Sequence, residues 1–518
     1  MSAPDRDQAS LRGPTPARAI ALRVLLRVER GAFANVALDE ALSASTLDER
    51  DRSLVTALVD GTLRWRGRLD HALEHCLAHP LDSLTPAIRT ILRLGAHQIL
   101  FMSAIPPRAA CDEAVRMART RGHRGTAGLV NAVLRRLAAA GEPPLPDRAV
   151  DEVAYISIVH SHPRWLVERW IANYGIAAAE AICQTDNRPA PVCLRPNRLR
   201  TTADQLGTAL AAEGMTVVPS PIACGALRLA SGGNPTRAAA YEAGLYSVQG
   251  EASIVVGLVA RPPRGGLVLD MCAGVGGKST HMAELMDNQG RILAVDRQGR
   301  KLAKLNQECA RLGITIIETR EADARTLGRQ GQLPISPEPC CTRVDRDAEI
   351  GNCPYFPPGQ GFDVCLLDAP CSGTGALRRR PDSRWRNLQD RIAPLAALQG
   401  ELLRKAVALV RPGGVIVYSA CSLEPEETED VVSQAAHRPQ AAHRSQAASG
   451  GLRLEDCRGI VSGVPGSAFA PDGSIRLMPH LHDTDGMFIA RLRRVASPHY
   501  SCPVAQASRL RASASWYE

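Results

Sequence analysis

Two cysteines in the second half of the chain stand where a thiol can do covalent chemistry. Cys371 lies in DAPCSGTG (368–375) and Cys421 in YSACS (418–422), and each follows a short apolar run that predicts a strand. Most free cysteines are small buried hydrophobes, and we expect that role for Cys76, Cys183, Cys309 and Cys365. Cys371 and Cys421 instead follow strands at the edge where doubly wound sheets place their sites. A thiolate there could attack an electrophilic carbon.

A glycine-rich turn follows an earlier predicted strand. The segment LVLDMCAGVGGKST leaves its apolar run at Asp270 and passes through Gly274, Gly276 and Gly277 into a predicted helix. Glycines let a ligand approach the backbone closely, and a helix N-terminus attracts negative charge. The next predicted strand ends in Asp296, an acid placed to bind ribose hydroxyls. The pattern indicates an adenosine-type cofactor, and an NAD site remains open from this much.

Three further residues narrow the chemistry. Asp323 in EAD (321–323) suits adenine recognition, and Asp368 opens a motif that differs from dehydrogenase patterns. Lys278 is one of only four lysines in a chain with 58 arginines. Its place beside the turn marks a position where a compact ammonium could engage a carboxylate or favour a nearby thiolate.

The sequence around these motifs predicts an α/β domain. From about Ala243, apolar runs alternate with helical stretches such as 298–312; the runs are GLVLDMC, RILAVD, ITIIETREAD, FDVCLLDAP and GGVIVYSAC. Parallel strands need crossover helices, so this alternation predicts a doubly wound parallel sheet. Two stretches without periodicity, 334–361 and 437–450, are predicted loop insertions, and 497–518 is a predicted flexible tail.

The first 140 residues predict an all-helical domain, because apolar residues recur there at steps of three and four. The proline-rich segment GEPPLPDR (141–148) separates it from a small α+β unit of alternating helices and strands. We therefore expect a multidomain chain: a helical domain at 1–140, an α+β subdomain at 145–235 and an α/β domain at 236–496.

Composition limits the setting of the protein. The apolar fraction of 45% and the charged fraction of 22% are those of a folded globular chain. A net charge of +9 favours polyanionic partners. Fifteen cysteines, a polar start and no apolar run of about 18 residues predict a cytoplasmic protein without a membrane segment. Cys340, Cys341 and Cys353 contain no C-x-x-C pair, so we expect no metal. We also expect a monomer.

Several motifs together resemble one known family. They are VQGEAS (248–253), DMCAGVGGKST (270–280), AVD (294–296), EADA (321–324), LLDAPCSGTGALRRRPDSRWR (366–386) and YSACSLEPEETEDVV (418–432). These phrases are similar to those of the RNA cytosine-carbon-5 methyltransferases, and within them to the bacterial small-subunit ribosomal RNA enzymes of the RsmB or Sun type. The resemblance runs from about Arg18 to Arg494, and the helical front resembles the NusB family. It implies a class I, Rossmann-like methyltransferase domain, S-adenosylmethionine as cofactor and 16S ribosomal RNA as substrate.

The resemblance also implies roles for single residues. Carbon 5 of cytosine is a poor nucleophile, but addition of a thiolate at carbon 6 turns the ring into an enamine that can take a methyl group. By resemblance Cys421 is that thiolate, Cys371 assists product release and Asp368 binds ring nitrogen 3. We expect the Lys278 ammonium to engage the methionine carboxylate of the cofactor or the catalytic cysteines, where it would lower the pKa of a thiol. The implied cofactor residues are Cys272, Ala273, Gly274, Val275, Gly276, Gly277, Lys278, Asp296, Asp323 and Asp368. The family has Ala-Pro where this chain has Gly274-Val275, so we expect a looser cofactor loop.

A basic cluster follows Cys371 and predicts contact with RNA, because arginines neutralise phosphates and aromatic rings stack on bases. Its members are Arg378, Arg379, Arg380, Arg384, Trp385 and Arg386. The alternative for this cluster is a solvated, charged helix end. Two rival functions stay open. One is a ribosomal RNA assembly factor whose methylation is subsidiary, and the other is a DNA cytosine methyltransferase in which Cys371 would be the attacking thiol.

Overall fold

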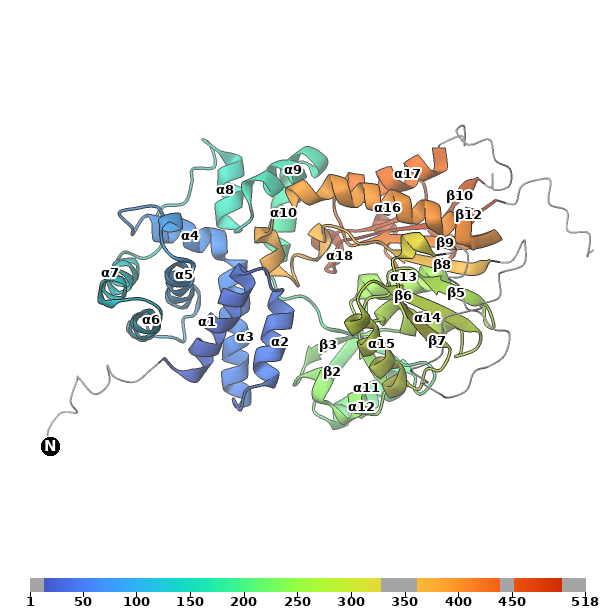
Figure 1. Ribbon diagram of the computed structural model, residues 1–518, viewed down its shortest axis with the longest axis horizontal. Coiled ribbons are helices and arrows are strands. Elements are labelled where there is room, and N and C mark those ends of the chain that lie inside the picture. Colours follow the sequence, from blue (N-terminus) through green and yellow to red (C-terminus); the bar gives the residue numbers. More distant parts are fainter. Residues whose placement is uncertain (1–13, 328–360, 438–450, 496–518) are drawn as a thin grey trace, which may run out of the picture. The chain divides into compact units, whose positions relative to one another are not determined.

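The computed structural model describes residues 14–327, 361–437 and 451–495. They form two compact units, and most of their helices and strands are labelled in Figure 1. Unit 1 contains the described residues of 1–190 together with 376–390, and unit 2 contains those of 191–375 and 391–518. Apart from residues 361 and 437, the predicted insertions and the predicted tail lie outside the described residues. Every helix in the described ranges is too short or too polar to cross a bilayer.

Unit 1 is built from helices, as the apolar spacing predicts. Asp48 and Thr85 each begin a helix, because their side chains accept a hydrogen bond from a backbone N–H of the first turn. The helices are α1 (Pro16–Glu29), α2 (Ala34–Ser43), α3 (Glu49–Arg64), α4 (Arg66–Glu74), α5 (Pro86–Phe101), α6 (Pro107–Arg121), α7 (Arg124–Ala140), α8 (Glu152–Val159), α9 (Arg164–Tyr174) and α10 (Ile176–Asp186).

Helix α5 is buried along most of its length and packs into one core with its neighbours α1, α3, α6 and α7. Its Arg93 is 3% exposed and donates to both oxygens of Asp70, at 2.6 and 2.8 Å. Arg93 also reaches Glu29 at 3.2 Å. These two carboxylates offset the cost of placing a guanidinium in the core.

His97 makes unit 1 sensitive to acid. It is 5% exposed and stacks near Phe101, and burial lowers its pKa to about 4 from the usual 6.5. Between about pH 6.5 and pH 4, His97 binds a proton in the unfolded chain but stays neutral in the folded unit. The free energy of unfolding is therefore unaffected by His97 above about pH 6.5, and it decreases as the pH falls toward 4. Between pH 7 and pH 5, we expect the urea concentration at the midpoint of unfolding to fall less for His97→Gln than for the original chain. Equal losses for the variant and the original chain would contradict this account.

Unit 2 begins with a small antiparallel sheet of order β2-β3-β1-β4. Its elements are β1 (Cys193–Pro196), α11 (Ala203–Ala212), β2 (Thr216–Pro219), β3 (Leu227–Ser231), α12 (Ala239–Glu242) and β4 (Tyr246–Val248). Leu194, Leu206, Leu210 and Tyr246 form its core. The boundary between the units at residue 190 lies inside the predicted 145–235 segment, because α8 to α10 belong to unit 1. The domain limits at 140, 235 and 496 stay predictions.

The larger sheet of unit 2 has the order β10-β12-β9-β8-β5-β6-β7, with β11 paired to β12. Its strands are β5 (Leu267–Asp270), β6 (Arg291–Asp296), β7 (Ile317–Glu321), β8 (Phe362–Asp368), β9 (Val410–Ala420), β10 (Leu452–Glu455), β11 (Ile475–Leu477) and β12 (Met487–Arg494). The helices beside it are α13 (Glu251–Ala260), α14 (Gly277–Leu285), α15 (Gly299–Leu312), α16 (Gln389–Leu409), α17 (Glu429–His437) and the short α18 (Pro479–His482).

Helices cover both faces of this sheet (Figure 1). Side chains of α13, α14 and α15 share one core with alternate strand residues such as Val268, Leu366 and Val417. Side chains of α16 and α17 share a second core with the residues between them, such as Leu269 and Ile416. The burial of both faces explains the continuous apolar runs of these strands.

The strands β5 to β9 pair in parallel, which confirms the predicted doubly wound core. The sequence did not predict β10, β11 and β12, which add an antiparallel edge and make the sheet mixed. Strand β12 is hard to recognise because a buried arginine interrupts its apolar pattern. That residue, Arg491, is 7% exposed and donates to the carbonyls of Val259 and Ala260 and to Glu455.

Candidate active site

The predicted site residues follow the ends of the parallel strands. Asp270, Asp296 and Asp368 are the last residues of β5, β6 and β8. Asp323 lies two residues past β7, and Cys421 follows β9 directly. Because these strands run parallel, their carboxyl ends meet at one edge of the sheet. The structure therefore brings the predicted cofactor and catalytic positions to a single edge of unit 2.

The turn between β5 and α14 requires glycine. Gly274 and Gly276 have φ angles of +59° and +86°, which side-chain-bearing residues rarely adopt. A Cβ on Gly276 would lie 2.0 Å from Leu305, whereas one on Gly274 would meet nothing within 4 Å. Val275 is 53% exposed. The backbone around Gly274 is thus open to a ligand.

Two carboxylates hold this turn. Asp270 is 1% exposed and accepts from the Ser279 hydroxyl at 2.6 Å, and burial raises its pKa to about 6. Asp296 accepts from the backbone N–H of Gly274 at 3.0 Å and of Gln298 at 2.9 Å. Asp296 is therefore fixed beside the glycine-rich turn, at the place where the sequence predicts a ribose.

Asp323 has a local partner that the sequence did not indicate. Its carboxylate accepts from the backbone N–H, Nε and Nη2 of Arg325, and the Nη2 contact is 2.7 Å. The side-chain contact with Arg325 lowers the pKa of Asp323 to about 2. A ligand at the end of β7 would therefore meet the ionised carboxylate of Asp323, which also accepts hydrogen bonds from Arg325.

Lys278 and Asp368 form an ion pair at the centre of the edge, with Nζ 2.5 Å from Oδ2. The other oxygen of Asp368 accepts from the Ser419 hydroxyl at 2.8 Å. Burial by itself would lower the pKa of Lys278. The negative charge of Asp368 outweighs this effect, and the charges of Cys421 and Asp270 raise the pKa further. A fixed ammonium thus lies beside Asp368, close enough to Cys421 for the two charges to interact.

The sulfurs of Cys371 and Cys421 lie 3.4 Å apart. The contact with Cys421, followed by burial, raises the pKa of Cys371 well above the usual range of a thiol. Because a proton can be shared across this distance, the pair can hold one thiol and one thiolate together. The structure brings together the two cysteines that the sequence singled out, 50 residues apart.

Glu427 also belongs to this edge, although it is not among the residues that the sequence motifs predict for the site. It is 0% exposed and accepts from Ser372 and Ser422, the residues that follow the two cysteines. In the sequence Glu427 stands in the acid-rich run EPEETED, which reads as an ordinary charged helix start. A buried carboxylate can be recognised only once its partners are known.

The basic cluster after Cys371 lies in unit 1. Arg384 is 0% exposed, and its guanidinium donates to the carbonyl of Asp186 at 2.6 Å and to Asn187 Oδ1 at 2.7 Å. Arg378 is also buried and donates to the carbonyls of Arg188 and Pro189. The structure therefore gives Arg378 and Arg384 a structural role in place of the predicted RNA contact, because their donors already serve protein carbonyls.

The other members of the cluster divide between structure and surface. Trp385 donates from Nε1 to the carbonyl of Leu63 at 2.8 Å, and Arg386 donates to the carbonyls of Gly31 and Ala32. Arg379 and Arg380 are exposed. Only these last two arginines keep the surface position that RNA binding needs.

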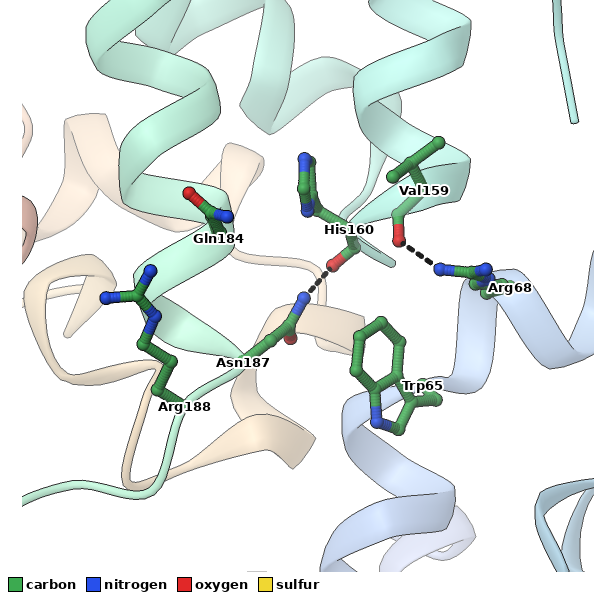
Figure 2. Close-up of a pocket in the computed structure, with 7 residues that line it drawn as sticks. All are labelled: Trp65, Arg68, Val159, His160, Gln184, Asn187 and Arg188. Atoms are coloured by element: carbon green, nitrogen blue, oxygen red, sulfur yellow. Dashed lines mark hydrogen bonds between the residues drawn. The ribbon is translucent and has the colours of Figure 1, made fainter. Parts of the chain in front are cut away.

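A hollow of about 330 Å³ lies within unit 1, between α4 and the helices α8 and α10 (Figure 2). The Trp65 ring lines it and stacks on Phe101, with centroids 4.8 Å apart. Asn187 donates to the carbonyl of His160, and Arg68 to that of Val159, so the wall is held by internal hydrogen bonds. None of the predicted catalytic or cofactor residues lines this hollow.

No group of three His, Cys, Asp or Glu side chains within 14–327, 361–437 and 451–495 could hold a metal ion. Cys340, Cys341 and Cys353, the cysteines considered above as metal ligands, lie outside the described residues.

The chain matches three described families. Residues 258–493 match the 16S rRNA methyltransferases RsmB/F, residues 15–139 match the NusB family, and residues 162–235 match an RsmF/B-like, ferredoxin-like methyltransferase domain. The first two matches agree with the resemblances inferred from the sequence motifs.

Full-length relatives are also similar. The "Probable ribosomal RNA small subunit methyltransferase B" of Bacillus subtilis (strain 168) is 34% identical over 93% of this chain and 99% of its own length. The "Ribosomal RNA small subunit methyltransferase B" of Pseudomonas syringae pv. tomato is 31% identical over 86% and 90%. The crystal structure of PH0851 is 25% identical, with a TM-score of 0.73 over 95% of this chain and 100% of that one.

Proposed function

Because this chain belongs to the RsmB/F family of 16S rRNA methyltransferases, we propose that it methylates carbon 5 of a cytosine in small-subunit ribosomal RNA. The proposed route is a covalent adduct between Cys421 and carbon 6 of the base. The observation that carries this proposal is the pair of sulfurs 3.4 Å apart, beside the Lys278–Asp368 ion pair. A methyltransferase that acts on a nitrogen or oxygen nucleophile has no need of two adjacent thiols.

The residues at the sheet edge fit S-adenosylmethionine. The open backbone at Gly274 and the fixed Asp296 suit the nucleoside part, and Asp323 would receive the adenine. The positive N-terminal end of α14 and Lys278 suit the methionine carboxylate. When bound, S-adenosylmethionine supplies an electrophilic methyl group on a sulfonium.

Cys421 would start the reaction. Its thiolate would add to carbon 6 of the cytosine, and the new S–C bond would make an enamine of the ring. Carbon 5 could then attack the methyl carbon, whose bond to the sulfonium sulfur would break and leave a neutral thioether. The Lys278 ammonium favours this thiolate, because the charge of Cys421 is one of the groups that raise the pKa of Lys278. Asp368, held by Lys278 and Ser419, would share the proton that ring nitrogen 3 carries in the adduct.

Cys371 would finish it. In the free enzyme, its contact with Cys421 raises the pKa of Cys371 and keeps that thiol protonated. Once Cys421 is bonded to carbon 6, the charge of Cys421 is gone, so the pKa of Cys371 falls and its proton can pass to water. The Cys371 thiolate that remains can act as the base. A base must remove the proton from carbon 5, after which the S–C6 bond breaks and Cys421 returns as a thiolate. The two thiols thereby act in sequence.

RNA contact would come from exposed basic residues. Arg379 and Arg380 follow the Cys371 loop closely and are exposed, and the NusB-like helices of unit 1 supply further arginines. The target cytosine must leave its stack, because its reacting carbons are shielded inside a helix. We expect the enzyme to act as a monomer.

The proposal is tested by incubating the protein with labelled S-adenosylmethionine and either free 16S ribosomal RNA or assembling small subunits, followed by bisulfite sequencing. A single protected cytosine supports it. Methylation on another base, or no methylation of either substrate, would overturn it.

Replacing Lys278 with methionine is expected to lower kcat/KM by a factor of at least about 10, because Asp368 and the Cys421 thiolate both lose their counter-charge. We expect Lys278→Arg to restore little, since the planar guanidinium does not fit a compact ammonium site. Methyl transfer to ribosomal RNA measures both variants. Lys304→Met removes an exposed lysine on α15 and should leave the rate near that of the original chain.

A further inference from the structure

One carboxylate joins the two loops that carry the cysteines. Each cysteine is followed by a serine, and the hydroxyls of Ser372 and Ser422 both donate to Oε2 of Glu427. The Ser422 contact is 2.6 Å, and the two hydroxyls lie 3.3 Å from each other. The backbone N–H of Ser372 donates to the other oxygen, Oε1, at 2.8 Å. Three donors from both cysteine loops therefore converge on Glu427.

The position of Glu427 is itself fixed. Gln399 of α16 donates to Oε1 at 3.3 Å and to the carbonyl of Pro370 at 2.9 Å. The Tyr418 hydroxyl donates to the backbone carbonyl of Glu427 at 2.6 Å. Glu427, Gln399, Ser372 and Ser422 are all buried. Burial raises the pKa of Glu427, while the serine donors oppose the rise.

We propose that Glu427 is a positioning residue that sets the separation of the Cys371 and Cys421 sulfurs by tying together the serines that follow them. This inference rests on the proposed function, because the separation matters only if both thiols act on one base. Glu427 acts through Ser372 and Ser422, whose hydroxyls and one backbone N–H donate to its carboxylate.

The carboxylate also has an electrostatic effect on one thiol. Its negative charge is among the groups that raise the pKa of Cys371, after the Cys421 contact and burial. Removing this charge should therefore lower the pKa of Cys371. A residue with only a packing role would leave that pKa unchanged when replaced by an isosteric amide.

Glu427→Gln is the direct test. Glutamine keeps the volume of the side chain, but it replaces one carboxylate oxygen by an amide NH₂ group, which cannot accept from a serine hydroxyl or from the Ser372 N–H. We expect kcat to fall by a factor of about 10 to 100, since small misplacements of reacting groups have effects of this size. The KM for S-adenosylmethionine should stay within about twofold, because the glycine-rich turn is untouched. A raised KM with an unchanged kcat would overturn the proposal.

A second readout does not need methylation. The rate of alkylation of Cys371 by iodoacetamide, followed by peptide mass spectrometry across pH, should reach its midpoint at lower pH in Glu427→Gln than in the original chain. An unchanged midpoint would overturn the electrostatic part of the proposal. If the original chain makes no 5-methylcytosine, the proposed function fails, and this measurement still decides what Glu427 does to the thiol.

Glu429→Gln is the matched control. It removes another carboxylate of the same run, one that pairs with Arg476 and lies outside the serine contacts, so kcat and the alkylation midpoint should stay as in the original chain. If Glu427→Gln does not fold, the double variant Ser372→Ala with Ser422→Ala removes the hydroxyl donors and keeps the carboxylate. It should show the same loss of kcat at constant cofactor KM, and a normal kcat would overturn the proposal.

Discussion

Cys421→Ala is expected to abolish methyl transfer to ribosomal RNA, with a loss in kcat/KM on the order of 10³-fold or more, because removal of a covalent nucleophile leaves only binding. With 5-fluorocytosine-substituted RNA, the original chain should form a stable protein–RNA adduct, since fluorine at carbon 5 blocks the last proton removal. Cys421→Ala should form none.

Cys371→Ala separates the roles of the two thiols. If Cys371 acts after the methyl group has moved, this variant should still form the adduct and should release the product slowly. Adduct formation retained in Cys421→Ala and lost in Cys371→Ala would reverse the assignment and point to the chemistry of DNA cytosine methyltransferases. Cys224→Ala, which alters an exposed cysteine, should behave like the original chain. Full ribosomal function of Cys421→Ala in cells would favour the assembly-factor alternative.

Arg195→Leu is expected to destabilise unit 2 by about 3–5 kcal/mol, the range found when one partner of a buried ion pair is removed. Arg195 is 3% exposed and its Nη2 lies 2.7 Å from Oε1 of Glu284, which is 0% exposed. The same guanidinium donates to the carbonyl of Gly277 at 2.7 Å and to Thr280 at 3.1 Å. The substitution would leave a carboxylate buried without its cation.

Urea unfolding, followed by the fluorescence of the chain and by hydrogen exchange of α14, measures the effect. Arg264→Leu is the control, because Arg264 pairs with Asp287 on the surface and both side chains are largely exposed. A surface pair of this kind contributes little, so we expect a change within about 0.5 kcal/mol. Equal effects of the two substitutions would contradict the role assigned to Arg195.

The sequence predicted the residues at the sheet edge better than the buried residues that hold them in place. Cys371, Cys421 and Asp296 could be found because each follows an apolar run, and a parallel sheet brings such ends together. Glu427 could not be found, because its importance comes from burial between two serines 50 residues apart. A local charge pattern gives no measure of burial.

In the basic cluster that follows Cys371, the sequence predicted RNA contact for two arginines that the structure buries. Arg378 and Arg384 were expected at RNA on the strength of their charge, yet both lie inside unit 1 among backbone carbonyls of residues 64, 161, 186, 188 and 189. Those acceptors come from a part of the chain about 190 to 320 residues earlier. Local sequence cannot tell a cation that meets carbonyls from one that meets phosphates, because both partners are oxygen acceptors.

The placement of residues 376–390 in unit 1 bears on how such a protein can change during evolution. A stretch from the middle of the chain supplies Arg384 and Trp385 to the helical unit, while the residues before and after it belong to unit 2. A chain cut at residue 190 would leave each fragment with unmatched donors or carbonyls. The two units are therefore interleaved along one polypeptide, and we expect them to be inherited together and to resist exchange as separate modules.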